Sequence, residues 1–174
     1  MKLVFVSGTS DIDKATLIDL ALQRSGRRGE FTLIDFDKIH DTQGDIEEAE
    51  DTETARRILA TFYDRVEKTM IARLKEHRGD MVLNGCLTFV TRHGYMRALP
   101  DEFFRGFKPD SIVILEKSDD MLQKADAKTA EHQRINRYYG TIYSSIAGSA
   151  LKIIEFNEKK MIDAVLELSE IVKH

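Results

Sequence analysis

The sequence predicts an α/β protein: one domain over residues 1–174, with a five-stranded parallel sheet and helices on both faces. Two patterns predict this class. Five short apolar runs are continuous rather than alternating, which is typical of strands buried on both faces. Helical periodicity fills the stretches between them, so helices are expected to cover the sheet. A chain of 174 residues, 42% of them hydrophobic, can bury one sizeable core and is too short to suggest two ordinary domains.

Each strand and each main helix is predicted from its own pattern. The five apolar runs are KLVFV (2–6), FTLID (31–35), DMVLN (80–84), SIVIL (111–115) and ALKIIEF (150–156). One helix is indicated by apolar residues that recur every four positions, Ile58, Phe62, Val66, Met70 and Leu74. A C-terminal helix is indicated by the helical spacing of Met161, Val165, Leu168 and Val172.

An acidic segment, DTQGDIEEAEDTE (41–53), is the one compositional break. It contains seven acidic residues, no basic ones and few apolar positions. We expect a mobile surface segment here. The alternative is a solvated loop whose carboxylates cap the start of a helix over 52–78.

Charge and cysteine content narrow the function classes. The 26 basic and 30 acidic residues give a formal charge of −4, which does not favour nucleic acid or anionic lipid as a partner. The single cysteine, Cys86, excludes an internal disulfide. The apolar stretch after Met1 is too short for a membrane span and lacks the flanks of a signal peptide, so we expect a cytoplasmic protein.

The stretch SGTSDIDKAT (7–16) lies where a phosphate-binding loop would be, after the first strand and before a helix. The loop pattern G-x-x-x-x-G-K-[ST] uses glycines to aim backbone N–H groups at phosphates, a lysine to neutralise charge, and a hydroxyl to hold magnesium. Gly8 and Lys14 have the required spacing, but Asp13 replaces the second glycine and Ala15 replaces the hydroxyl residue. Thr16 carries a hydroxyl one position too late.

Two alternatives stay open for the residues that the loop retains. Gly8 and Lys14 either still hold a phosphate, or Gly8 only closes a tight turn and Lys14 lies in solvent. In both cases residues 8–16 are expected to keep a strand-turn-helix path, with Thr9 or Ser10 accepting backbone hydrogens near the helix start.

Read as a whole, the chain resembles the archaeal type of adenylate kinase. The most specific match is NGCLTFVTRHGYMRALPDEFFRGFKPDSIVILE (84–116), followed by EHQRINR (131–137) and the closing strand ALKIIEF (150–156). The resemblance covers nearly the whole chain. It implies a three-layer P-loop fold of the nucleoside-monophosphate kinases, and it also implies a homo-oligomer, a trimer in this family.

The resemblance also implies roles for single residues. Lys14 would be catalytic in an active kinase, and the nucleotide-binding residues would be Gly8, Lys14, Thr16, Gln133, Asn136 and Arg137. For the last three, the alternative is that they are polar residues on the exposed side of a helix whose Ile135 and Tyr139 face the core. Cys86 is expected to be inert packing, and His132 to make a helical hydrogen bond.

Several groups that the family uses for catalysis are changed. The acid at the end of the third strand is Asn84, so no protein ligand for a metal is expected there. No arginine lies between Arg28 and Arg56, where the family grips AMP. The segment after Glu116, KSDDMLQKADAKTA, corresponds to the lid of the family but is shorter. It contains none of the arginines that the family uses there, and Lys124 and Lys128 remain.

These changes predict an adenylate-kinase-like protein that has lost efficient transfer between ATP and AMP. It would act as a weak nucleotide-binding module or through an unknown protein partner, with no required cofactor and ATP, ADP or phosphate bound weakly at most. The alternative is an active kinase or slow ATPase that uses Mg²⁺ with atypical ligands. A third hypothesis, RNA binding through RSGRRG (24–29), competes with surface charge at a helix end.

Overall fold

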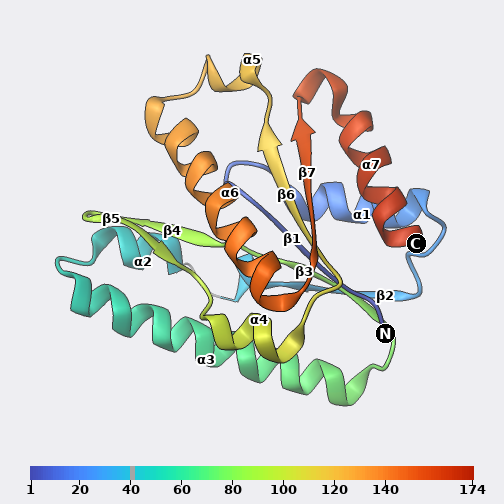
Figure 1. The fold of residues 1–174 in the computed structure, drawn as a ribbon, viewed down its shortest axis with the longest axis horizontal. Coiled ribbons are helices and arrows are strands. Elements are labelled where there is room, and N and C mark those ends of the chain that lie inside the picture. The colour runs from blue at the N-terminus through green and yellow to red at the C-terminus, as the bar shows by residue number, and fades with distance from the viewer. Residues whose placement is uncertain (40–41) are drawn as a thin grey trace.

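The computed structural model describes residues 1–39 and 42–174, and its centre is a five-stranded parallel sheet (Figure 1). The strand order is β2-β3-β1-β6-β7, and every neighbouring pair is parallel. The prediction of five parallel strands is confirmed. The strands are β1 (Leu3–Gly8), β2 (Phe31–Asp35), β3 (Asp80–Asn84), β6 (Ser111–Lys117) and β7 (Ala150–Phe156).

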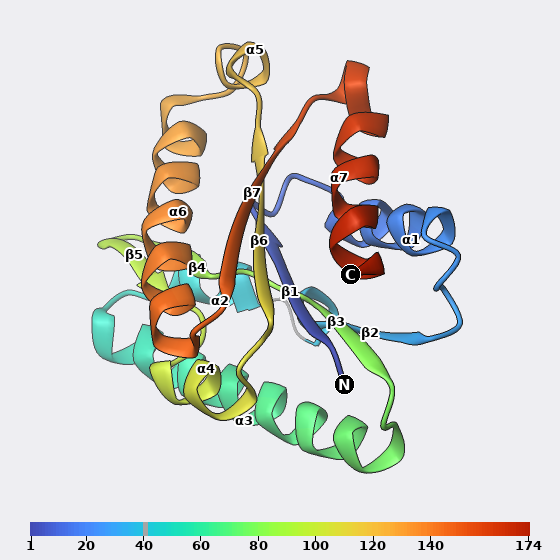
Figure 2. The same ribbon diagram turned by 45° about the vertical axis from the view of Figure 1, so that its right-hand side comes forward.

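Helices cover both faces of this sheet, as Figure 2 shows. Side chains of α1 (Lys14–Arg24) and α7 (Met161–Lys173) pack with Val4 and Val6 on one face. On the other face, Phe5 packs with apolar side chains of three helices. These are α3 (Thr52–Glu76), α4 (Asp101–Phe107) and α6 (Ala127–Ala147). The three-layer arrangement follows from strands that are apolar on both sides.

The acidic segment is helical over residues 42–48 and packs against the core, so the prediction of a mobile surface segment is wrong there. They form α2 (Thr42–Glu48), whose Ile46 is fully buried. Gln43 fixes this helix because its side-chain amide bonds the backbone of Val90. The capping interpretation is right for Asp51, which accepts from the Thr54 N–H at the start of α3. Asp41 lies outside the described residues.

A two-stranded antiparallel hairpin follows β3 and was not predicted. It pairs β4 (Thr88–Thr91) with β5 (Gly94–Arg97). Gly94 lies at its turn with φ +124°, a conformation that other residues rarely adopt. The remaining elements are short: η1 (Phe36–Lys38), α5 (Asp119–Leu122) and η2 (Glu158–Lys160).

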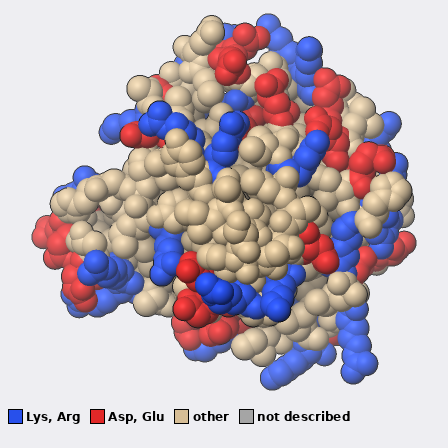
Figure 3. Space-filling model, in the orientation of Figure 1, with Lys and Arg blue, Asp and Glu red and all other residues tan. Residues whose placement is uncertain are grey.

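Charged side chains are unevenly distributed over one face of the molecule (Figure 3). In the orientation of Figure 1, charged side chains gather toward the periphery, while the centre of the face is mostly uncharged (Figure 3). Exposed apolar side chains lie on the two helices that flank β7: Tyr138 and Ile142 on α6, and Ile162 and Leu166 on α7. Among the described residues, no helix combines the length and apolar character that crossing a bilayer requires.

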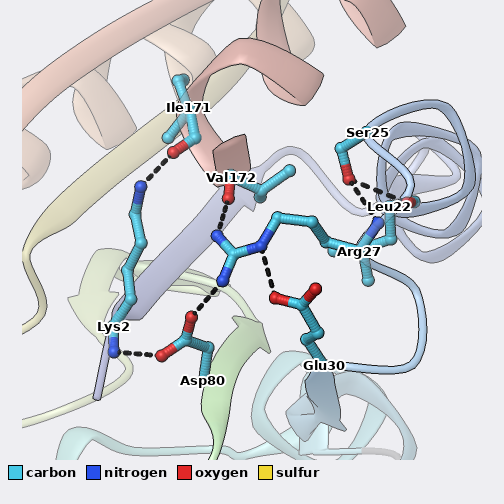
Figure 4. A network of polar contacts seen from close by, with 8 residues as sticks. All are labelled: Lys2, Leu22, Ser25, Arg27, Glu30, Asp80, Ile171 and Val172. Atoms are coloured by element: carbon cyan, nitrogen blue, oxygen red, sulfur yellow. Dashed lines mark hydrogen bonds and ion pairs between the residues drawn. The ribbon is translucent and has the colours of Figure 1, made fainter. Parts of the chain in front are cut away.

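A polar network at the amino-terminal edge of the sheet fastens the last helix (Figure 4). Arg27 donates to the carbonyl of Val172 at 2.6 Å and forms an ion pair with Asp80 at 2.7 Å. Lys2 donates to the carbonyl of Ile171. Arg28 pairs with Asp19 at 2.5 Å. Since two arginines of segment 24–29 are held by carboxylates, a structural role explains this segment better than RNA binding does.

Candidate functional site

The loop between β1 and α1 keeps the predicted strand-turn-helix path, but its backbone donors are turned inward. The Ile12 N–H donates to the Thr9 carbonyl at 3.1 Å, and the Lys14 N–H donates to the Ile12 carbonyl at 2.8 Å. The Ile12 side chain is buried in the core. A loop that grips phosphate needs such N–H groups to converge outside it. At least two N–H groups of this loop already donate to carbonyls within the loop.

Asp13 occupies the N-terminus of α1 with its own carboxylate. Its oxygens accept from the Thr16 N–H at 3.2 Å and from the Thr16 hydroxyl at 2.8 Å. These hydrogen bonds lower the pKa of Asp13, so the cap is negatively charged at neutral pH. Thr9 does accept a backbone hydrogen near the helix start, through its carbonyl, but the residue that caps α1 is Asp13. Thr16, predicted to bind nucleotide, donates its hydroxyl to this cap.

Gly8 is needed for close packing of the sheet. A Cβ at this position would lie 2.7 Å from the Leu115 carbonyl oxygen on the neighbouring strand β6. The backbone φ of Gly8 is not positive, so the turn does not require the conformational freedom of a glycine. Its suggested contact with phosphate stays a prediction.

Lys14 is buried and held in an ion pair. Its Nζ lies 2.9 Å from Oδ2 of Asp37, and its side chain is only 1% exposed. The alternative of a solvated first-turn lysine is therefore wrong. Burial alone would lower the pKa of Lys14, but Cys86 and the carboxylates of Asp37 and Asp35 beside it raise the pKa above its ordinary value. Asp37 is the anion in contact with Lys14. The ammonium is therefore charged, and the Asp37 carboxylate already balances its charge.

The neighbours of Lys14 come from the carboxyl ends of β2 and β3. Asn84 ends β3 and donates from its amide to Oδ1 of Asp35 at 2.9 Å. Its Oδ1 is buried and has no hydrogen-bond partner among the described residues. The thiol of Cys86 lies 3.5 Å from Asp37. Burial and this carboxylate raise the pKa of Cys86 to about 12, so it is a neutral thiol at pH 7.

A cleft of about 460 Å³ opens above the loop. Thr9, Ser10 and Asp11 line it from the loop, Val90 and Arg92 from the hairpin, and Lys128 and His132 from α6. Arg92 donates to the Glu47 carbonyl at 3.2 Å, and Lys117 forms an ion pair with Asp11. Of the basic residues Arg92 and Lys128 that line the cleft, the first is thus engaged within the protein, and Asp11 of the lining already has a cationic partner in Lys117.

The three α6 residues expected to bind nucleotide all make contacts within the protein. Gln133 is buried and uses both ends of its amide, because the Lys117 N–H donates to it at 2.7 Å and it donates to the Lys117 carbonyl at 3.1 Å. Asn136, also buried, accepts from the Thr88 hydroxyl. Arg137 holds Glu116 with two hydrogen bonds, one of 2.9 Å from Nε.

These contacts revise one alternative. Gln133 and Asn136 are buried, so the interpretation of an exposed polar face is wrong for them. Both fasten α6 to neighbouring strands. Whether they also contact a nucleotide stays a prediction.

Sequence reasoning missed the partners of these residues. Asp35 ends the second strand and Asp37 comes two residues later. This position is the signal that could have identified them, since carboxyl ends of parallel strands meet at one edge. His132 makes the expected kind of contact, a 2.9 Å hydrogen bond between its Nε2 and the Thr88 hydroxyl, although this partner lies on β4 and not on its own helix. Its ring stacks on Tyr95. In residues 1–39 and 42–174, no three His, Cys, Asp or Glu side chains form a group that could hold a metal ion.

Comparison with known proteins gives consistent relatives. The adenylate kinase of Pyrococcus furiosus is 30% identical, over 97% of this chain and 94% of its own length. That of Pyrococcus horikoshii is 27% identical with the same coverage, and that of Methanopyrus kandleri is 27% identical over 63% of this chain and 64% of its own length. No protein-family model matches the chain.

One solved structure supports the fold. A crystal structure from Chloroflexus aurantiacus, of a protein assigned as a kinase, matches with a TM-score of 0.50 and 14% identity. The match covers 99% of this chain and 97% of that chain. At this identity the similarity shows the fold alone.

Proposed function

Because this chain belongs to the adenylate kinase family, we propose that it is a member whose ATP:AMP phosphoryl transfer has become inefficient, and that it acts as a weak nucleotide-binding or protein-interaction module. The observation that carries this proposal is the occupation of the phosphate loop by the protein's own carboxylates. Asp13 caps α1, at the place where a phosphate would accept hydrogen bonds from backbone N–H groups, and Asp37 balances the charge of Lys14.

The charge balance of the loop opposes an incoming phosphate. To reach a phosphate, Lys14 would have to leave Asp37, and that carboxylate would then lie uncompensated beside the ligand. At an effective dielectric near 20, each unit charge about 5 Å from a phosphate opposes it by ~3 kcal/mol. Lys14 offsets roughly one such charge, and Asp13 remains.

Magnesium binding would lack direct protein ligands. Adenylate kinases transfer phosphate from ATP with Mg²⁺, which prefers oxygen ligands. Ala15 has no hydroxyl, and Asn84 offers a neutral amide oxygen instead of a carboxylate. The hydroxyl of Thr16 donates to Asp13. No cofactor is required for the proposed role, and Mg²⁺ is needed only if transfer occurs.

The arginines that stabilise a transferring phosphoryl group are also missing from the expected segments. The segment between Glu116 and α6 contains none. Arg137 is engaged by Glu116. Removing one preorganised charge stabiliser typically costs about 10² to 10³ in rate, so several changes together favour inefficient transfer.

A coupled assay with ATP and each nucleoside monophosphate tests the proposal. We expect no turnover above that of Lys14→Ala at any monophosphate concentration. The second candidate, an active kinase or slow ATPase, is favoured by the cleft above the loop and by a lysine kept at the start of α1. Magnesium-dependent turnover that Lys14→Ala abolishes would establish it and refute the first.

A further inference from the structure

The strand β7 lies at an edge of the parallel sheet. It pairs with β6 on one side and ends the strand order on the other. Figure 1 shows it between α6 and α7. The unpaired side of an edge strand offers a row of N–H and C=O groups that can hydrogen-bond an added strand.

A groove of about 530 Å³ opens beside this edge, on the side of α6. Ile153 and Glu155 line it from β7, and Arg134 and Tyr138 line it from α6. Tyr138 is 56% exposed, and Ile142 one turn further along α6 is 49% exposed. The groove is therefore mixed in character: most of its lining is polar or charged, and Leu122, Tyr138 and Ile153 give it an apolar part on which side chains of an added strand can pack.

Alternation along β7 determines which of its side chains face this groove. Lys152 points to the opposite face, because its Nζ pairs with Glu167 of α7 at 3.0 Å. Ile154 packs with apolar side chains of α1 and α7. Side chains alternate between faces, so Leu151, Ile153 and Glu155 share the α6 face.

The charges of the groove favour a basic partner. Glu116 is paired with Arg137, and Lys117 with Asp11. In the part of the chain that the structure describes, Glu155 and Asp119 have no ion-pair partner, and Arg134 is the only groove cation without one. A side chain that faces Glu155 on an added strand should therefore be positively charged.

A second copy of β7 does not supply that charge. Two copies of β7 could pair edge to edge as antiparallel strands, with opposite residues on the same face. Each possible register places one residue opposite its own copy, and this residue is the centre of the register. Centring on Ile153 places Glu155 opposite Leu151, and centring on Ile154 places it opposite Ile153. Centring on Glu155 or Lys152 places like charges opposite each other, which is destabilising. These registers favour another protein over self-pairing.

We propose that the edge of β7 binds an extended segment of a partner protein, in which apolar side chains pack over Ile153 and Tyr138 and a basic side chain faces Glu155. This inference rests on the protein-interaction part of the proposed function and adds the surface and the chemistry of the partner. It does not depend on the phosphate loop.

Titration of the protein with an end-capped peptide tests it, by fluorescence anisotropy. Every second residue of this lysine–valine peptide is threonine, and the residues between them alternate between valine and lysine, so one face of the strand presents both valine and lysine. We expect saturable binding that is stronger than binding of the matched glutamate–valine peptide. The exposed substitution Glu155→Lys should reverse this preference, with a change of about threefold to tenfold for each peptide. The control Glu102→Lys makes the same charge change on α4 and should leave the preference intact.

Backbone methylation separates strand addition from general charge attraction. Alternate residues of a strand point their N–H groups to the same neighbour. One lysine–valine peptide is N-methylated at its threonines, and another at its lysines and valines. We expect only one of them to lose binding. Equal binding of both, or an unchanged preference in Glu155→Lys, would overturn the inference.

Two further measurements on the same samples separate the possible failures. Light scattering that detects self-association displaced by the peptide would assign the edge to a second copy and overturn the choice of partner. A titration with Mg-ATP reports on the proposed function independently. Weak Mg-ATP binding without peptide binding refutes the β7 inference alone, whereas peptide binding together with micromolar Mg-ATP binding refutes only the weak nucleotide binding of the proposed function.

Discussion

Lys14 and Asp37 form an ion pair of 2.9 Å in which the lysine side chain is 1% exposed and the carboxylate side chain 35% exposed. A buried ammonium is tolerated only with an anion beside it. In this protein the anion comes from the segment after β2. The lysine of the loop therefore already has the negative partner that a phosphate would be.

Asp37→Asn should destabilise the protein, because it leaves the Lys14 ammonium buried without an anion. Breaking a fully buried pair costs about 3–5 kcal/mol, and the partial exposure of Asp37 reduces the expected loss to about 1–3 kcal/mol. Urea unfolding measures it. Sulfate should restore more stability to this variant than to the unchanged protein. Equal stabilisation of the variant and the unchanged protein by sulfate would show that Lys14 does not become available to bind an anion.

Gln133→Ala should cost about 1–2 kcal/mol of stability, since both backbone groups of Lys117 lose their partner. It should leave the affinity for Mg-ATP unchanged if Gln133 only fastens α6. Calorimetry of binding and of unfolding gives the two quantities. Arg134→Ala, one residue along on the exposed surface, is the matched control. A fall in Mg-ATP affinity without loss of stability would instead place Gln133 in a nucleotide site.

The stability of the protein should fall on acidification through the range below pH 6.5, with a contribution from His132. Burial lowers the pKa of His132 below its ordinary value, while its contact with Thr88 and the charge of Glu47 act in the other direction. The unfolded state then binds more protons than the folded state in this range, so stability rises with pH. His132→Gln should flatten the difference in unfolding free energy between pH 7.5 and 5.5. An unchanged difference would rule out His132 as a contributor.

Much of the fold could be predicted because the apolar runs are direct evidence of burial. The runs at 31–35, 80–84 and 150–156 coincide with β2, β3 and β7. The hairpin β4–β5 was missed because its partly exposed residues give no continuous run. Helix α2 was missed because its seven residues bury little more than Thr42 and Ile46, while its acidic surface resembles a loop.

The candidate site could be predicted only in part, because pairing across the sheet is not visible in the sequence. The sequence shows that Asp13 replaces the second glycine of the loop pattern, and the structure adds that its carboxylate caps α1. The neutral amide of Asn84 was recognised, but not its contact with Asp35. Lys14 was placed either on a phosphate or in solvent. Its actual partner, Asp37, is 23 residues away and becomes a neighbour only when β2 joins the sheet.

Isothermal titration with Mg-ATP tests most directly whether the protein's own carboxylates block the phosphate loop. We expect a dissociation constant in the millimolar range or weaker, on the order of −4 kcal/mol of binding free energy. The double substitution Asp13→Gly with Ala15→Thr removes the capping carboxylate and restores a hydroxyl for magnesium, so it should tighten binding by about tenfold or more. A micromolar constant for the unchanged protein, or no gain in the double variant, would contradict this explanation.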